Sequence, residues 1–464
     1  MNLIRRRILY ITFIIVFLAM APLLLMYTNG YRYDFKKGVV IKTGILILES
    51  NPQKVNVYIN NELKYTKTPI DRASLLPGLY EIKITKNGYY PWTKKLKIES
   101  NLTTFAQDVI LFKKSTSVKI INGNFNDFTI SKDNAKIITL WQDEATAEIW
   151  EYKLKEQSSN LLLRNSLNNS EIKLGEWSKN NKNLIFNNYG KTEQKNNYFI
   201  IQFKESFWSN EDEIKTIKLN ELISDPIINI KWDDNDDNVA YVNTKDSLYR
   251  INLMDQIIKE ISKDKISDFI IYDKILYFNT ELFCLIEIDK NQINTQNSII
   301  DDCIYHPAKE KDYQLISSPQ GLITLVSENS KNSLVIDLNN KNKIFQIQTE
   351  EIKWDSASNK MLYYNDIEIA TFSPSHQHPY KNEIIGRYSQ EIKKVLWYPS
   401  HHHLIILFND NLKIIELDTR DKRNVVSLNS FTNLKNIYID EKGKNIYVVG
   451  SKDGESGIWQ INIF

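Results

Sequence analysis

The feature that most constrains this chain is a repeat of about 40 residues that runs from residue 113 to residue 464. Four copies share an aromatic residue, a polar turn, and an apolar strand start seven residues after the aromatic. These copies are Trp177 with Leu184, Trp232 with Val239, Trp354 with Met361, and Trp397 with Leu404. A unit of this length forms a few short strands that bury only one face, so several units must stack around a common axis.

Weaker copies of the repeat occur at the same spacing along the chain. Two of them have isoleucine in place of the aromatic residue, Ile130 with Ile137 and Ile439 with Ile446, and two degenerate ones run from Ile271 to Phe278 and from Ile316 to Val326. Trp397 follows Trp354 by 43 residues, and the 122 residues from Trp232 to Trp354 hold three periods of about 41. The repeat therefore predicts a β-propeller of eight blades, or of seven if a degenerate copy is not a blade. It resembles the repeats of TolB-like and WD-type bacterial propellers, in which an aromatic residue ends an inner strand.

The ring also has to close. The last copy, Asn436 to Phe464, ends at its third strand, Ile458 to Phe464. The segment Ser117 to Ile121 precedes the first copy and belongs to no blade of its own. We expect this segment to pair with the last strand, because such pairing removes an exposed sheet edge.

The N-terminus carries a candidate membrane anchor. Residues 8–27 are apolar apart from Thr12, and a helix of this length spans a hydrocarbon core of about 30 Å. Arg5, Arg6 and Arg7 precede it, which predicts a single-pass protein with a cytoplasmic N-terminus and its bulk outside the cell. The alternative is a cleaved signal peptide, since Ala19-Met20-Ala21 is a small-x-small sequence, but Pro22 would follow the cut and the apolar run continues.

A smaller module lies between the anchor (residues 1–30) and the propeller. After a linker at residues 31–44, residues 45–112 contain short alternating strands such as Val57-Tyr58-Ile59. They are separated by turn signals at Thr68-Pro69, Pro77-Gly78 and Asn87-Gly88. The order of these signals resembles a PEGA domain, a small β-sandwich of bacterial and archaeal surface proteins, although Pro52-Gln53-Lys54-Val55 departs from the motif that names the family. The resemblance implies a surface location and a spacer or adhesive role, and it brings no catalytic residues.

The charge balance and the number of cysteines argue against several classes of function. Lys and Arg number 59 against 57 Asp and Glu, so no global charge favours nucleic-acid binding. The two cysteines, Cys284 and Cys303, cannot form a disulfide framework or a four-ligand zinc site. A disulfide between them is possible outside the cytoplasm, but we favour two buried thiols in neighbouring strands.

Four polar clusters invite a site interpretation, and we reject each of them. His401-His402-His403 and Asp233 to Asp237 occupy the repeat position just before a strand start, which indicates hairpin turns rather than metal or calcium sites. His376 and His378 lie in a loop rich in proline. Ser451 to Trp459 is similar to the Asp-box of sialidases, but its glycine and tryptophan are displaced by one position. The sequence therefore predicts no catalytic residues, no cofactor-binding residues and no metal ligands.

Two functional classes remain. The favoured one is a membrane-anchored binding or scaffold protein that presents a propeller surface at the cell envelope to a protein, glycan or cell-wall partner. The alternative is an extracytoplasmic enzyme, acting on glycans or peptides, whose site is assembled from scattered loop residues. The absence of a recognisable set of acid, base and nucleophile favours a protein that is not an enzyme and needs no cofactor.

Overall fold

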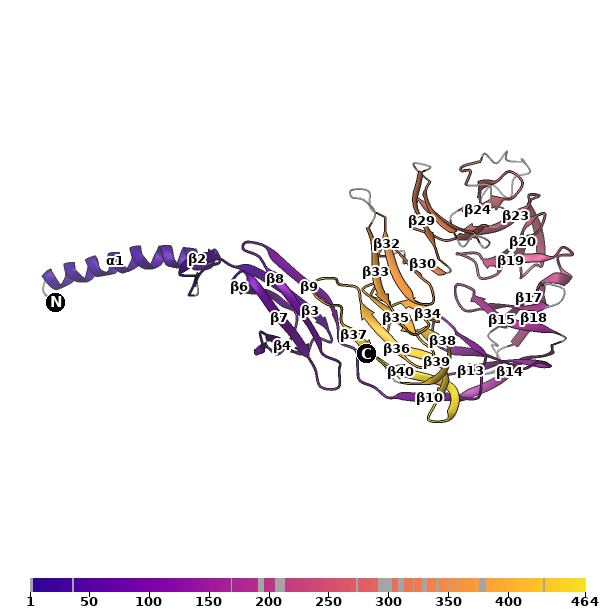
Figure 1. The fold of residues 1–464 in the computed structure, drawn as a ribbon, viewed down its shortest axis with the longest axis horizontal. Helices are drawn as coiled ribbons and strands as arrows, with labels where there is room; N and C mark the ends of the chain where they lie inside the picture. The colour runs from indigo at the N-terminus through magenta and orange to yellow at the C-terminus, as the bar shows by residue number, and fades with distance from the viewer. Residues whose placement is uncertain are drawn as a thin grey trace.

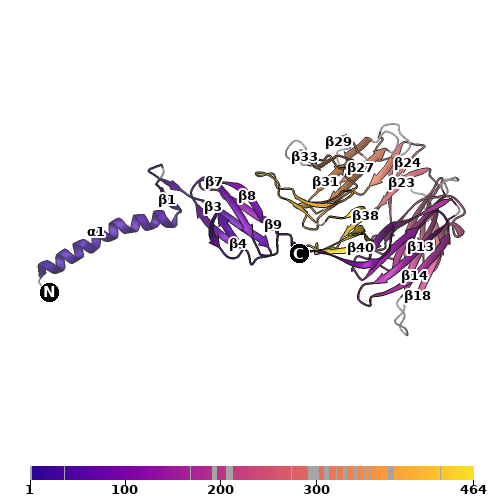
Figure 2. The same ribbon diagram turned by 60° about the horizontal axis from the view of Figure 1, so that its bottom comes forward.

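The structure is a computed structural model that describes residues 3–35, 37–167, 169–190, 196–204, 213–272, 274–290, 303–307, 313–319, 321–327, 332–338, 342–349, 351–355, 357–374, 381–428 and 430–464. Across these residues the protein is mostly β, and one long helix lies at its N-terminal end (Figure 1). In both views the helix, a small β module and a ring of sheets follow one another along the long axis (Figures 1 and 2).

Helix α1 runs from Leu3 to Thr28 and contains Pro22. Its segment Ile4–Thr28 is long and apolar enough to cross a membrane by length and composition, and none of that window is buried against the rest of the protein. A helix of this length and composition can serve as a membrane span or as a signal sequence.

The segment expected to be a linker forms a two-stranded antiparallel hairpin directly after the helix. It consists of β1 (Tyr31–Asp34) and β2 (Val39–Lys42), in register from Tyr31 with Lys42 to Asp34 with Val39. Gly38 has a φ of 68° in the turn, a conformation that glycine adopts without steric cost.

The small module is a two-layer β-sandwich, as predicted. One sheet has the order β6-β3-β9 and the other β5-β4-β7-β8. The strands are β3 (Gly44–Asn51), β4 (Asn56–Ile59), β5 (Glu62–Tyr65), β6 (Ile70–Leu75), β7 (Gly78–Thr85), β8 (Trp92–Ile98) and β9 (Thr103–Ile110). Alternate residues of each strand face a shared apolar core that includes Leu48, Val57, Ile84 and Leu96.

After residue 113 the described chain forms eight antiparallel sheets of three or four strands, named here the first to the eighth in chain order. The first comprises β11 (Asp127–Ile130), β12 (Lys136–Gln142), β13 (Thr146–Lys153) and β14 (Ser158–Ser166); the second β15 (Ser170–Trp177), β16 (Asn183–Gly190), β17 (Asn196–Lys204) and β18 (Glu213–Lys218), followed by the 3₁₀ turn Leu219–Glu221. The third comprises β19 (Ile227–Trp232), β20 (Val239–Thr244), β21 (Leu248–Asn252) and β22 (Ile257–Ser262); the fourth β23 (Ile266–Ile271), β24 (Lys274–Asn279) and β25 (Cys284–Asp289).

The second half continues the series. The fifth sheet comprises β26 (Tyr313–Ile316), β27 (Leu322–Ser327), β28 (Asn332–Asp337) and β29 (Asn342–Gln348); the sixth β30 (Glu351–Asp355), β31 (Lys360–Tyr364), β32 (Glu368–Ser373) and β33 (Lys381–Arg387). The seventh comprises β34 (Lys394–Trp397), β35 (His403–Leu407), β36 (Leu412–Glu416) and β37 (Val425–Ser427); the eighth β38 (Thr432–Ile439), β39 (Asn445–Lys452), β40 (Glu455–Asn462) and β10 (Ser117–Asn122). Whether the ring is counted as eight or seven blades stays a prediction.

Apolar side chains pack between each sheet and the next around the ring. The first and second sheets share a core that includes Ile138 and Phe186, and the seventh and eighth share one that includes Leu412 and Val448. Between the eighth and the first sheet, Ile458 packs in one cluster with Ile137. Each sheet thus buries both faces against neighbours, as the stacked repeat requires.

The predicted closure of the ring is confirmed. Strand β10 pairs antiparallel with β40, with Ser117 opposite Ile461 and Lys119 opposite Trp459. The two backbones approach closely at Gly457, where a β-carbon would lie 2.3 Å from the carbonyl oxygen of Ile121. The start and the end of the propeller therefore belong to one sheet.

The repeat tryptophans pack between adjacent sheets; Trp177 and Trp232 are buried, whereas Trp354 and Trp397 are only partly buried. Each indole N–H donates to the preceding sheet: Trp177 to Thr129 Oγ1 at 3.2 Å, Trp232 to Glu176 O at 2.9 Å, Trp354 to Thr324 Oγ1 at 2.8 Å and Trp397 to Lys353 O at 3.3 Å. Pairing the polar end of a large apolar ring lets tryptophan bury its area without an unsatisfied donor.

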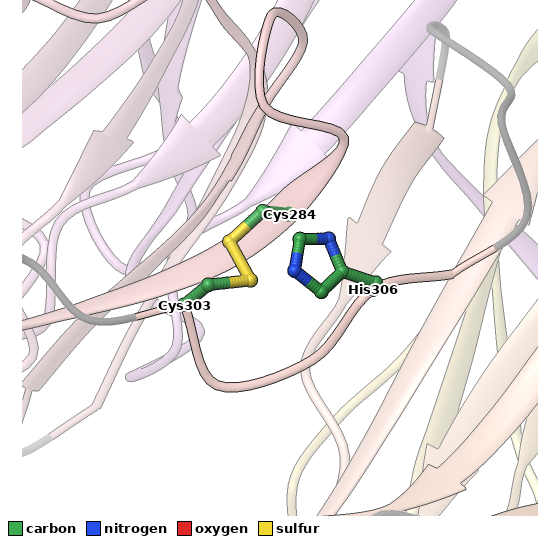
Figure 3. Close-up of side chains that lie close together, drawn as sticks. All are labelled: Cys284, Cys303 and His306. Atoms are coloured by element: carbon green, nitrogen blue, oxygen red, sulfur yellow. A yellow bond between two sulfur atoms is a disulfide. The ribbon is translucent and has the colours of Figure 1, made fainter.

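The expectation of two free thiols is wrong. Cys284 at the start of β25 is joined to Cys303 by a disulfide with an S–S distance of 2.01 Å (Figure 3). Cys303 does not lie in a neighbouring named strand; it precedes an isolated bridge between Tyr305 and Leu285. Tertiary contact brings the two residues together, which their 19-residue separation could not show.

Candidate functional site at the junction of the two modules

The β-sandwich meets the propeller along strand β8. This strand lies at the edge of its sheet, with β7 on one side. On the other side, Asn424 and Asp421 of the seventh propeller sheet accept backbone N–H groups. Thr93 donates to Asn424 Oδ1 at 3.3 Å, and Lys95 donates to Asp421 Oδ2 at 2.9 Å. These acceptors satisfy an edge that would otherwise be open to another strand, and the bond from Lys95 lowers the pKa of Asp421.

A buried ion cluster lies beneath this edge. Lys94 is fully buried, and its Nζ lies 2.9 Å from Glu416 Oε2 and 3.3 Å from Asp418 Oδ2. It also donates to the carbonyl oxygen of Asp418 at 2.9 Å. The Trp92 indole N–H donates to Glu416 Oε1 at 2.9 Å. Charges removed from water are tolerated only when they are paired and hydrogen-bonded in this way, so the cluster specifies one docked arrangement.

Aromatic packing covers the same junction from the connector between the modules. Phe112 stacks edge-on against Tyr398 and His403, with ring centroids 5.4 and 5.3 Å apart. Burial lowers the pKa of His403 to about 4, although Glu416 opposes that shift. His403 is therefore neutral at physiological pH and acts as a packed ring rather than as a cation.

A polar cleft opens beside the junction, along strand β9. This strand is also an edge strand, next to β3. One cavity of about 480 Å³ lies between β9, the Ser50–Asn51 corner and His402, and a smaller one of about 190 Å³ lies between β9 and Arg420. His402 Nε2 lies 3.3 Å from Asp108 Oδ1. The cleft therefore combines an exposed strand edge with charged side chains from both modules.

Around the propeller axis, polar side chains join the first strands of successive sheets. Lys231 on β19 lies 3.1 Å from Asp268 on β23. Lys353 on β30 donates to the carbonyl oxygen of Val395 on β34 at 3.2 Å, and Lys394 on β34 donates to Asn436 Oδ1 on β38 at 2.6 Å. These bonds connect neighbouring sheets, so the three lysines have a structural role.

Burial perturbs two of these lysines. It lowers the pKa of Lys353 to about 8, with a further contribution from the positive charge of Lys394, and it lowers the pKa of Lys394 as well. A cavity of about 630 Å³ lies elsewhere on the axis, where the first strands of the second to fifth sheets contribute Lys173, Asn229 and Gln314 to its wall. These side chains can hydrogen-bond a polar ligand.

The histidine triplet does not converge on one point. His401 has a φ of 64° in the turn, and its Nδ1 lies 2.8 Å from Asp355 Oδ1 of the sixth sheet. His402 faces Asp108 of the sandwich, and His403 packs on Phe112. The turn prediction is right for His401 and His402, but His403 is already the first residue of β35. His376 and His378 lie outside the described residues.

The acidic cluster Asp233 to Asp237 is a turn, as predicted, and the segment Ser451 to Trp459 is the end of one strand, a tight turn and the start of the next. Asp233 accepts the backbone N–H of Asn235 at 2.8 Å between β19 and β20, and Asp237 accepts that of Asn180 in the neighbouring sheet at 2.7 Å. Asp453 and Gly454 form the tight turn between β39 and β40, with φ values of 52° and 81°. Asp233 thus serves its own turn, and Asp237 connects the turn to the neighbouring sheet.

One potential ligand group was not foreseen. Within the described ranges, ligand atoms of Cys284, Cys303 and His306 lie within 4.8 Å of one another (Figure 3). His306 Nδ1 lies 3.1 Å from the carbonyl oxygen of Phe283. Because both sulfurs are consumed by the disulfide, the group as it stands offers no thiolates.

Sequence reasoning missed Lys94 and Glu416, which are 322 residues apart in the chain and meet only in the fold. One signal existed: Lys94 occupies an inward position of an alternating strand, between Trp92 and Leu96. A lysine at a core position indicates a buried anion. The pattern could not say which carboxylate supplies it.

Comparisons with known proteins support both modules. Residues 43–110 match the family model described as PEGA domain. A comparison with curated protein sequences gives no match. Among solved structures, Sqt1 from Chaetomium thermophilum aligns with a TM-score of 0.50 and 10% identity over 75% of this chain and 100% of that chain. The β-propeller domain of Cps50 (Swd1) from Myceliophteria thermophila aligns with a TM-score of 0.42 and 10% identity over 76% of this chain and 100% of that chain.

At such identity a structural likeness shows the fold alone. The chain therefore contains a PEGA domain and a β-propeller behind an apolar N-terminal helix. A TolB-like type of propeller and a bacterial origin stay predictions.

Proposed function

We propose that this chain is a single-pass membrane protein that holds a binding propeller at a fixed position outside the cell. Helix α1 anchors it, the PEGA domain spaces the propeller from the bilayer, and the propeller with the adjacent cleft presents the binding surface. The proposed partner is an envelope protein, a glycan or a cell-wall polymer.

One observation carries the proposal: the two modules are docked rather than loosely tethered. Lys94 and Glu416 are buried at the junction, and Asp418 is partly buried beside them. The edge bonds to β8 and the Tyr90 hydroxyl, which donates to Ser427 O at 3.0 Å, add further fixed contacts. Rigid spacing is useful to a protein that presents one surface at a defined height and orientation, because pre-ordering lowers the entropic cost of binding.

The bonding of the axial lysines supports a binder rather than an enzyme. A lysine with a lowered pKa can act as a nucleophile or a base. Lys353 and Lys394, however, are each held by an acceptor on the next sheet. The lowered pKa of these two lysines follows from their burial between the sheets that they connect.

Topology is tested on intact cells with a C-terminal epitope on the full chain. Protease added outside should remove the epitope and leave a small membrane fragment that contains α1. Full protection in intact cells, followed by cleavage after lysis, would contradict the proposal.

Binding is tested by cross-linking on the same cells, followed by capture of the epitope. The matched control is a variant with charge reversal in the junction cleft, Asp108→Lys, because Asp108 is exposed and its replacement leaves the core intact. A specific envelope partner that is captured by the parent chain supports the proposal. Capture of none under conditions where the propeller is folded would refute it.

A further inference from the structure

The hairpin β1–β2 exposes an unusual set of side chains directly after the anchor helix. Its large apolar and aromatic residues are all at least partly open to solvent, and Phe35 is 89% exposed. Tyr31, Tyr33, Val39 and Val40 are exposed as well, and Ile41 is half-buried. Tyr33 lies opposite Val40, and alternation puts Tyr31 on the same face, whereas Val39 lies on the other face. Exposed apolar residues are ordinary when they are scattered, but several on one two-stranded hairpin indicate a surface that something else covers.

The hairpin is tied to the end of the helix rather than free to swing away from it. Arg32 donates to the carbonyl oxygen of Tyr27 at 2.7 Å, and its guanidinium lies 3.5 Å from the centre of the Tyr27 ring. Thr43 donates to the carbonyl oxygen of Gly30 through its backbone N–H at 2.8 Å and through its hydroxyl at 2.9 Å. The position of the helix therefore sets the position of the hairpin.

The length of the apolar helical segment places the hairpin at the lipid–water boundary. The apolar stretch of residues 8–27 spans about 30 Å as a helix, the thickness of the hydrocarbon core. Tyr27 then lies at the core boundary. The headgroup layer beyond it is about 5–8 Å deep on each side. The hairpin begins four residues after Tyr27 and is bonded to it, so it starts inside that layer.

Its composition fits the same layer. Tyrosine rings combine an apolar body with a polar tip, and they collect at membrane interfaces. Lys37 and Lys42 supply cations on the same hairpin, whose long side chains can reach lipid phosphates while their stems stay in apolar surroundings.

We propose that the β1–β2 hairpin lies in the outer headgroup layer of the membrane and acts as a second, interfacial anchor. The occupant of its exposed face is lipid. This placement fixes the tilt of the PEGA domain and of the docked propeller above the bilayer. It rests on the proposed function in one respect, namely that α1 spans the membrane.

The test uses single cysteine substitutions, because the chain has no free cysteine of its own. The full-length protein is reconstituted in vesicles of phosphatidylcholine and phosphatidylglycerol and labelled with an environment-sensitive fluorophore at Phe35→Cys. Phe35 is too exposed for its replacement to disturb folding. Lipids that carry a quencher near the headgroup should remove most of the fluorescence.

Two further labelled variants give the controls. Met254→Cys lies in an exposed turn of the propeller, and its fluorescence should be unaffected by quencher lipids. Phe17→Cys lies near the middle of α1 and should respond to a quencher placed deep in the acyl chains. Val40→Cys reports a second hairpin site, in case the label at residue 35 disturbs its surroundings.

The outcomes separate the two proposals. Quenching at residues 17, 35 and 40, with none at 254, supports the interfacial hairpin. Quenching at residue 17 alone overturns the hairpin inference and leaves the anchor intact. No quenching at residue 17 refutes the membrane anchor itself. Quenching at residue 35 that disappears when phosphatidylglycerol is omitted still supports the placement and assigns it to the basic residues.

Discussion

Removing the cation at the centre of the junction, by Lys94→Met, should destabilise the docked protein. Methionine fits a similar volume, so the change removes charge with little loss of packing. It leaves Glu416, whose side chain is 6% exposed, without its 2.9 Å cationic partner. Glu416 keeps three other donors: the indole N–H of Trp92 at 2.9 Å, and the side-chain amide and backbone N–H of Asn424 at 2.9 and 3.2 Å.

Breaking a buried ion pair by removing one partner costs about 3–5 kcal/mol. The three donors that remain stabilise the Glu416 carboxylate, so we expect about 3 kcal/mol, at the lower end of that range. Calorimetry on the detergent-solubilised protein should show a lowered unfolding temperature. Proteolysis within the connector between the modules, near Lys113, should also become faster.

The matched control is Lys97→Met on the same strand. Lys97 also pairs with a glutamate, at 2.6 Å from Glu99, but its side chain is 74% exposed. Exposed pairs contribute about 0–1 kcal/mol, so this variant should stay close to the parent. The double variant Lys94→Met/Glu416→Met should recover most of the loss, because no unpaired charge is then buried. Equal stability of the Lys94 and Lys97 variants would refute the reasoning.

Four other outcomes are expected. Gly457→Ala should weaken the pairing of β10 with β40, because the new β-carbon would lie 2.3 Å from a backbone carbonyl oxygen; hydrogen exchange of β40 should increase. Trp232→Ala should cost about 3–5 kcal/mol in denaturant unfolding, through lost packing between the second and third sheets. Reducing the Cys284–Cys303 disulfide should cost about 3 kcal/mol by releasing the chain it closes, as followed by thermal unfolding with and without a dithiol. Because the pKa of Lys353 falls from 10.5 to about 8 on folding, the unfolded chain binds more protons between those values. Stability should therefore rise with pH across that window, and Lys353→Met should reduce the rise, because Lys394 also has a lowered pKa, and should stabilise the protein at pH 7.

Each of these outcomes has a simple contradiction. Gly78→Ala is the control for Gly457→Ala, since its β-carbon would meet only an ordinary contact at 3.6 Å. Equal exchange in the two glycine variants would reject the closure argument. If Trp232→Ala lost binding to a partner at unchanged stability, Trp232 would be assigned to recognition of that partner and not to packing. If reduction left the melting temperature unchanged, the disulfide would not contribute to stability. If stability did not change with pH across the window, the interpretation of the Lys353 pKa would be wrong.

Local patterns predicted much of the fold because their causes are local. The spacing of Trp177, Trp232, Trp354 and Trp397 follows from the requirement that each sheet offer an apolar face and a turn at the same place. The closure by β10 followed from counting strands, since an unpaired edge is unfavourable anywhere. The turn at His401 was visible because its position in the repeat matched turns elsewhere.

The junction and the disulfide could not be predicted in this way. Lys94 meets Glu416, and Cys284 meets Cys303, only after separate units have folded and come into contact. The exposed hairpin β1–β2 was also treated as a linker, because two four-residue strands carry little periodic signal.

The sequence by itself determined the apolar helix, the sandwich and the stacked repeat, since each depends on hydrophobic periodicity that one stretch of chain carries within itself. Only the tertiary structure decided how these parts are joined. A buried lysine such as Lys94 is stable only where a carboxylate reaches it, and the distance between the two is a property of the folded chain, not of their positions along it.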